Sequence, residues 1–214
     1  MLRFLVTSIS LLKIPGETFI SCFLFFILMI PKEAYLRAGQ IHYAVCQKAK
    51  PLIREGALYL DIARQIEGFI GEYPEASLAF PVNLQPDNEV HYSPLPEDTR
   101  RIAKEGVMKV DVGVHVEGYI ADGAFTVALH PEYEDLVQFT QKVLHETLTG
   151  LKPGMNLSEI GRRLDRQMAG SKYKIIRNLM GHQVNPWDLH STKSVYVYEN
   201  ETPHVLEPGG SVCY

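Results

Sequence analysis

Two aspartates interrupt a pair of neighbouring apolar strands in residues 107–127, VMKVDVGVHVEGYIADGAFTV. A two-residue Glu-Gly turn between the strands would pair Gly113 with Asp122 across a hairpin. Because residues two apart on a strand share a face, Asp111 and Asp122 would lie diagonally on the same side. Gly113 has no side chain, so we expect a gap between the two carboxylates.

Two carboxylates held this close need a cation nearby. Their repulsion is of order 4 kcal/mol at a separation of ~4 Å and an effective dielectric constant of 20. A pair of divalent metal ions would offset that cost. The hairpin therefore predicts a metal site.

Composition limits the class of protein. The chain has 214 residues, of which 46% are hydrophobic and 21% charged, so one folded domain with an extension fits. The net charge of 21 − 25 = −4 gives no electrostatic basis for binding nucleic acid. The three cysteines (Cys22, Cys46 and Cys213) have neither metal-binding spacing nor an even number, so we expect a reducing, cytoplasmic setting.

Residues 1–30 form an apolar extension that differs from the rest of the chain. Residues 19–30, FISCFLFFILMI, are uncharged, but a spanning helix needs roughly 20 apolar residues, so we do not expect membrane insertion. The run could be a membrane-surface anchor, a segment buried against the domain, or upstream sequence from a wrong start before Met29. We favour the last alternative.

Residues 31–214 follow an α/β pattern. Apolar residues at helical spacing alternate with short strand patterns. The predicted helices cover residues 33–53, 58–72, 132–151 and 157–169, and the predicted strands cover 77–80, 174–179, 193–198 and 211–214.

An internal repeat divides this region into two similar halves. PLIREGALYLDIARQI aligns with TGLKPGMNLSEIGRRL at an offset of 154 − 56 = 98, which matches Gly56 with Gly154 and Arg64 with Arg162. Two α/β halves that face each other would explain these matches. If the second half also supplies a carboxylate from its last strand, that residue would lie just past Tyr214.

Five residues complete a pattern of known type: His91 in EVHYSP, Asp111 in KVDVGVH, Asp122 in YIADGAF, His182 in NLMGH and His190 in WDLH. Their order and spacing resemble the methionine aminopeptidases of the pita-bread metallopeptidase fold. AFPVNL (79–84) and HYSP (91–94) resemble the type II branch of archaea and eukaryotes. The resemblance covers roughly residues 33–214.

The resemblance implies a pita-bread fold and removal of the N-terminal methionine from peptides or nascent proteins by a bridging hydroxide on a dinuclear metal site. Asp111, Asp122 and His182 would bind the metals, and His91 and His190 would contact the substrate. The cofactor would be two divalent ions, chosen among Co, Mn, Fe and Zn by availability. Phe80 and Leu189 are candidate walls of a methionine pocket, although plain core packing explains them equally well.

Two further ligands, both glutamates, lie beyond Tyr214 in family members. We therefore expect the second half to be incomplete and the chain by itself to bind metal weakly and to hydrolyse peptides slowly. A second polypeptide could supply the remainder, and the ribosome is a further possible partner. The alternative functions are a non-catalytic pita-bread module that binds peptides, ribosomes or RNA, and a prolidase or aminopeptidase P relative, although GHQVNPWDLH does not resemble the latter.

Overall fold

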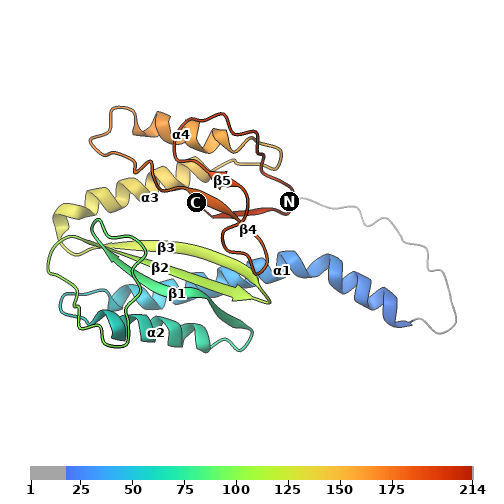
Figure 1. Cartoon of the computed structure of the whole chain (residues 1–214), viewed down its shortest axis with the longest axis horizontal. Helices are drawn as coiled ribbons and strands as arrows, with labels where there is room; N and C mark the ends of the chain where they lie inside the picture. Colours follow the sequence, from blue (N-terminus) through green and yellow to red (C-terminus); the bar gives the residue numbers. More distant parts are fainter. Residues whose placement is uncertain (1–17, 214) are drawn as a thin grey trace.

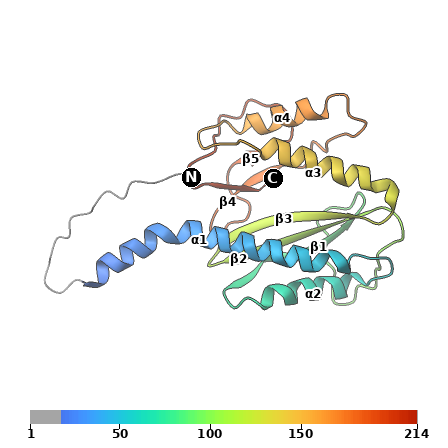
Figure 2. The ribbon, with the colours of Figure 1, turned by 180° about the vertical axis from the view of Figure 1, so that it is seen from behind.

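The computed structural model describes the backbone of residues 18–213 and the side chains of residues 32–213. The first half consists of two helices packed on a three-stranded antiparallel sheet of order β1-β2-β3. Figure 1 and Figure 2 show α1 lying along β2 and β3, with α2 beside β1. The elements are α1 (Thr18–Ala49), α2 (Tyr59–Gly71), β1 (Ala76–Pro86), β2 (Val107–Val116) and β3 (Tyr119–Ala128), with a short 3₁₀ helix, η1 (Lys50–Leu52), after α1.

The second half is smaller and lies beside β3 (Figure 1). Its sheet has the order β5-β4-β6, and its core cluster contains far fewer buried side chains than that of the first half. The elements are η2 (Pro131–Tyr133), α3 (Glu134–Leu148), α4 (Ser158–Met168), β4 (Gly181–Val184), β5 (Ser194–Val195) and β6 (Ser211–Cys213).

Strand β2 has one face in the hydrophobic core and carries polar residues on the other. Its even-numbered residues, from Met108 to Val116, are buried beneath the helices, whereas Lys109, Asp111 and His115 are only partly buried. Successive side chains on a strand point to opposite faces, so burial of one face leaves the other available for polar residues. The aspartates therefore lie on the face turned away from the first core.

The internal repeat is present in the hydrogen bonds. The Gly56 and Gly154 amides donate to the carbonyls of Ile102 and Leu206 at 2.9 and 2.7 Å. The return bonds repeat as well, from Ile102 to Ala57 and from Leu206 to Met155. Gly56 and Gly154 are 98 positions apart, whereas Ile102 and Leu206 are 206 − 102 = 104 positions apart. The halves therefore share one local structure, with a six-residue insertion in the second half. The predicted α/β fold of two similar halves is confirmed.

The tip of the β2–β3 hairpin joins the halves. Glu117 and Gly118 both have positive φ (51° and 85°), the conformation that a two-residue hairpin turn requires. The Trp187 amide donates to the Gly118 carbonyl at 2.9 Å, and the Trp187 ring contacts the His115 ring at a tilt of 58°, with centroids 4.9 Å apart. A Cβ on Gly118 would lie 2.2 Å from the indole nitrogen, so glycine is needed for this contact. The contact fixes the segment that follows β4 against the first half.

Some predicted elements differ from the observed ones. The strand expected at 77–80 continues through Pro81 to Pro86, because Pro81 lies at a register irregularity where no ladder hydrogen bond is required of it. The strand predicted at 174–179 is wrong: this segment is irregular, and the strand is β4, immediately after it. The apolar pattern of 174–179 instead places Ile175 against the second core.

The predictions for residues 1–17 and for the side chains of 18–31 lie outside the described residues. The backbone of 18–31 is the first part of α1, which is continuous across residue 31 and projects from the domain in Figure 2. Within the described part of the chain, no helix combines the length and apolar character that spanning a bilayer requires.

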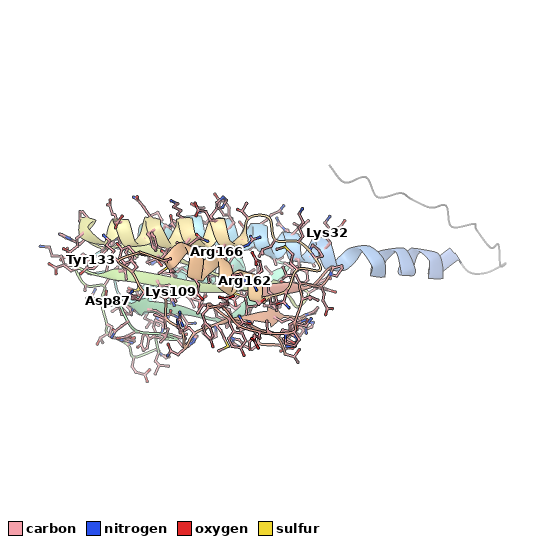
Figure 3. All side chains as sticks on the ribbon, turned by 90° about the horizontal axis from the view of Figure 1, so that it is seen from above. Lys32, Asp87, Lys109, Tyr133, Arg162 and Arg166 are labelled. Atoms are coloured by element: carbon pink, nitrogen blue, oxygen red, sulfur yellow. The ribbon has the colours of Figure 1, made fainter. Side chains whose placement is uncertain are left out.

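Helix α4 has a charged outer face and a tightly packed inner one. Arg162 and Arg166, labelled in Figure 3, both bond to Glu159, at 2.6 and 3.1 Å. On the inner side, Gly161 lies against the segment that follows β5. A Cβ at Gly161 would lie 1.9 Å from the carbonyl oxygen of Tyr198, so a larger residue would push α4 away from the second sheet.

We therefore predict that Gly161→Ala destabilises the chain by at least about 2 kcal/mol through overpacking against rigid backbone. The matched control is Gly68→Ala in α2, where an added Cβ meets nothing within 4 Å. That substitution should be neutral or stabilising by about 0.5–1 kcal/mol, from helix propensity alone. Urea unfolding followed by circular dichroism measures both, and equal stability of the two variants would contradict the packing described for Gly161.

Candidate metal centre

The hairpin register places both aspartates on one face. Gly113 pairs directly with Asp122, and Asp111 pairs with Ala124, as the turn predicted. Directly opposed residues share a face, so Asp111 and Asp122 are diagonal neighbours across Gly113. This confirms the predicted register. It does not confirm the predicted gap, because the Phe80 ring packs over Gly113 and would lie 2.3 Å from a Cβ there.

The second half brings an imidazole to Asp122. Nε2 of His182 on β4 lies 3.6 Å from Oδ2 of Asp122 on β3. Both side chains are largely shielded from solvent, with 19% and 10% of their surface exposed. Trp187, five residues after His182, contacts the hairpin tip and so links the segment after β4 to the first half.

Cys213 on β6 is the third member of this cluster. One ligand atom each from Asp122, His182 and Cys213 lies within 4.8 Å of the others. The sequence prediction missed Cys213, because cysteine spacing along the chain carries no sign of it. Asp111 does not belong to the cluster, although it lies on the same face of the hairpin.

These side chains fit a divalent cation. Two ligands of a tetrahedral metal with bonds of about 2.1 Å are roughly 3.4 Å apart, close to the 3.6 Å between Oδ2 and Nε2. Nδ1 of His182 is buried and has no hydrogen-bond partner among the described residues. No contact there fixes which ring nitrogen carries the proton, as a contact would in an ordinary ion pair. Among the described ion pairs, none joins Asp111 or Asp122 to a lysine or arginine, and the one that involves Asp122 is with His182.

The pKa of Asp111 also indicates a cation site. Burial, followed by repulsion from Asp122, raises the pKa of Asp111 to about 6 from an ordinary value of 3.8. The charges of Lys109 and His91 act in the opposite direction but do not cancel this shift. A carboxyl group with a raised pKa beside a second carboxylate is typical of a cation-binding site.

The two predicted catalytic histidines are both exposed to solvent. His190 is exposed, and its ring centroid is 4.3 Å from that of His182. His91 is also exposed, has a positive φ of 57°, and is near enough to Asp111 to lower the pKa of that carboxyl. The structure therefore brings His190 to His182 and His91 within electrostatic range of Asp111.

The predicted pocket walls have different surroundings. Phe80 covers Gly113 between the aspartates, whereas Leu189 is half-buried beside His190 in sequence. Two cavities adjoin the cluster, one of about 550 Å³ that Asp122 lines and one of about 950 Å³ that His182 lines, and Cys213 lines both. Neither cavity is lined by Phe80 or Leu189, and their role as pocket walls stays a prediction.

Gly123 faces the other side of the sheet from Asp122. His42 of α1 occupies the space that a side chain would need there, with its ring 2.9 Å from the position of a Cβ. The same ring lies 3.2 Å from the Gly123 carbonyl and 3.5 Å from Sγ of Cys46. Glycine at this position therefore lets α1 pack closely behind the strand that carries Asp122.

Comparison with known proteins identifies the family. The model of metallopeptidase family M24 matches residues 33–213, which include every residue of the candidate metal centre. The chain belongs to metallopeptidase family M24. This assignment agrees with the pita-bread resemblance seen in the sequence, and it implies divalent metal ions as cofactor.

Individual M24 relatives carry the name methionine aminopeptidase. The one from Saccharolobus solfataricus is 32% identical over 182 residues, which cover 81% of this chain and 60% of that protein. Methionine aminopeptidase 2 of Sclerotinia sclerotiorum is 34% identical over 201 residues, which cover 83% and 44%. The chain thus spans at most about 60% of the length of these two curated relatives.

Solved M24 structures share the fold. Methionine aminopeptidase from Thermotoga maritima superposes with a TM-score of 0.75 at 21% identity and covers 84% of this chain and 76% of that one. The prolidase from Pyrococcus furiosus gives 0.69 at 19% identity, with coverages of 85% and 54%. At these identities the superpositions establish the architecture alone.

The raised pKa of Asp111 predicts a pH dependence of stability without metal. The folded chain holds this proton up to about pH 6, whereas the unfolded chain releases it near pH 3.8, so the contribution of Asp111 to the free energy of unfolding should fall as pH rises between these values. The expected loss is on the order of 3 kcal/mol. Asp111→Asn should remove it.

Urea unfolding in EDTA at a series of pH values between about 4 and 7 measures this slope. The control is Asp61→Asn, which changes an exposed carboxylate on α2 and should keep the wild-type slope. Equal slopes in wild type and Asp111→Asn would contradict the assigned burial and repulsion.

Proposed function

We propose that this M24 chain supplies the metal-binding core of a methionine aminopeptidase, which removes methionine from the N-termini of peptides. The observation that carries the proposal is the approach of His182 and Asp122, from opposite halves, to within 3.6 Å on the face that also bears Asp111. The relatives named methionine aminopeptidase, with 32–34% identity, support this activity over others in the family.

Each residue has a role that follows from its position. Asp122 and His182 would hold a divalent ion, and Asp111 would supply a further carboxylate for a second one on the same face. A bound divalent cation would act as a Lewis acid on the scissile carbonyl and would lower the pKa of water. Without the ions, repulsion between the aspartates opposes ionisation of Asp111, so the site favours the metal-bound state.

His91 and His190 would contact the substrate rather than the metals. Both are exposed, and an imidazole N–H can donate to a carbonyl oxygen that gains negative charge during attack. The ring of His190 is positioned by its contact with His182. Phe80, over Gly113, would offer an apolar surface to an unbranched thioether side chain.

A second candidate function is cleavage beside proline, because the prolidase from Pyrococcus furiosus shares the fold. The residues around His190 favour the methionine-specific alternative. Co, Mn, Fe and Zn all suit carboxylate and imidazole ligands, and we propose peptide N-termini in the cytoplasm as substrates. Association with the ribosome or with a second polypeptide stays a prediction.

The test is a comparison of two peptides. The full chain with Co²⁺ or Mn²⁺ should release methionine from Met-Ala-Ser and should leave an Xaa-Pro peptide intact, as measured by mass spectrometry at high protein concentration and long incubation. Asp122→Asn should lower methionine release by at least about 100-fold, because it removes a metal ligand. Asp61→Asn, an exposed change far along the chain, should have no effect.

Two results would contradict the proposal. Cleavage of the Xaa-Pro peptide but not of Met-Ala-Ser would favour the prolidase alternative. Unchanged methionine release by Asp122→Asn would mean that the chemistry occurs elsewhere.

A further inference from the structure

Cys213 lies where a metal ligand would lie, although neither its spacing nor the resemblance assigns it a role. It pairs directly with His182 across β4 and β6, so the two side chains project from the same face of the second sheet. Its sulfur is 3.6 Å from the backbone carbonyl oxygen of Asp122, which brings it to the junction between the halves.

The internal repeat supports this orientation. At the offset of 104 seen between Ile102 and Leu206, Cys213 corresponds to Lys109 on β2. Lys109 is two residues before Asp111 and therefore shares its face. The equivalent face of β6 would point toward the same centre, and the cluster of Asp122, His182 and Cys213 within 4.8 Å agrees with this.

We propose that Cys213 Sγ is a third protein ligand of the ion held by Asp122 and His182. The inference rests on the metal-dependent function proposed above. A bond forms between sulfur and the cation, and the thiol proton leaves to the solvent. Oxygen, nitrogen and sulfur donors around one point suit a tetrahedral ion with a fourth position open to water or substrate.

A thiolate ligand changes which metal the site prefers. Carboxylate and water ligands suit Mn²⁺, whereas a soft sulfur donor favours Zn²⁺ and related ions. The chain should therefore bind Zn²⁺ and Co²⁺ more tightly than Mn²⁺, to a degree that depends on Cys213. The competing explanation is that the thiol only donates a hydrogen bond to the Asp122 carbonyl and never contacts the metal.

Cys46 provides a matched control within the same chain. It also lines the larger cavity, but its sulfur contacts His42 on the opposite side of the sheet from Asp122. Burial raises the pKa of the Cys46 thiol to about 11, which keeps it protonated at neutral pH. Cys46→Ser therefore removes a cysteine near the site without removing the proposed ligand.

Co²⁺ titration of the full chain, followed by absorption, tests the proposal. Visible d–d bands report that cobalt is bound in a protein site, and a near-ultraviolet sulfur-to-cobalt band reports a thiolate ligand. Wild type and Cys46→Ser should have both kinds of band. Cys213→Ser should keep the d–d bands and lose the charge-transfer band, and its affinity for Zn²⁺ should fall about tenfold or more while that for Mn²⁺ stays within a factor of two or so.

A second variant distinguishes loss of the sulfur ligand from loss of folding. Cys213→Asp keeps a ligand at this position, so it should bind cobalt with d–d bands and no charge-transfer band. D–d bands in wild type without a charge-transfer band, or a band that persists in Cys213→Ser, would overturn the thiolate ligand and leave the metal site intact. Absence of any cobalt spectrum in the folded wild type would overturn both this inference and the proposed function.

Discussion

The site depends on one interaction, the approach of an imidazole from one half of the fold to a carboxylate from the other. His182 and Asp122 are 60 residues apart, yet their polar atoms lie 3.6 Å from each other. Asp111 adds a second carboxylate on the same face, and burial with repulsion raises its pKa to about 6. A cation bound there would relieve the repulsion and bind the imidazole at the same time, so these groups together fit a metal ion.

Two local structures hold that interaction in place. Each half closes a loop with the same pair of backbone hydrogen bonds. In the first half Ile102 bonds to Gly56 and Ala57, and in the second Leu206 bonds to Gly154 and Met155. The halves then meet at the hairpin tip, where Trp187 packs on the bare backbone of Gly118. A backbone hydrogen bond and a tilted ring contact both act there, and they hold the segment after β4 beside the β2–β3 hairpin.

Local patterns in the sequence predicted the parts of the site that local rules determine. The Glu-Gly turn fixed the pairing of Gly113 with Asp122, and the apolar alternation of β2 fixed the face of Asp111. Contacts between distant segments follow no such rule, which is why the Phe80 ring over Gly113 and the place of Cys213 were not predicted. The wrong prediction of a strand at 174–179 has the same origin. A short apolar run that packs as an irregular segment has the composition of a strand.

Paramagnetic broadening by Mn²⁺ tests the shared cation most directly. In the full chain labelled with ¹³C and ¹⁵N, the carboxyl resonance of Asp122 and the ring nitrogens of His182 should broaden together at substoichiometric Mn²⁺, before the exposed carboxylate of Glu55 is affected. Broadening of only one of the two, or of Glu55 first, would contradict an ion held jointly by the two halves.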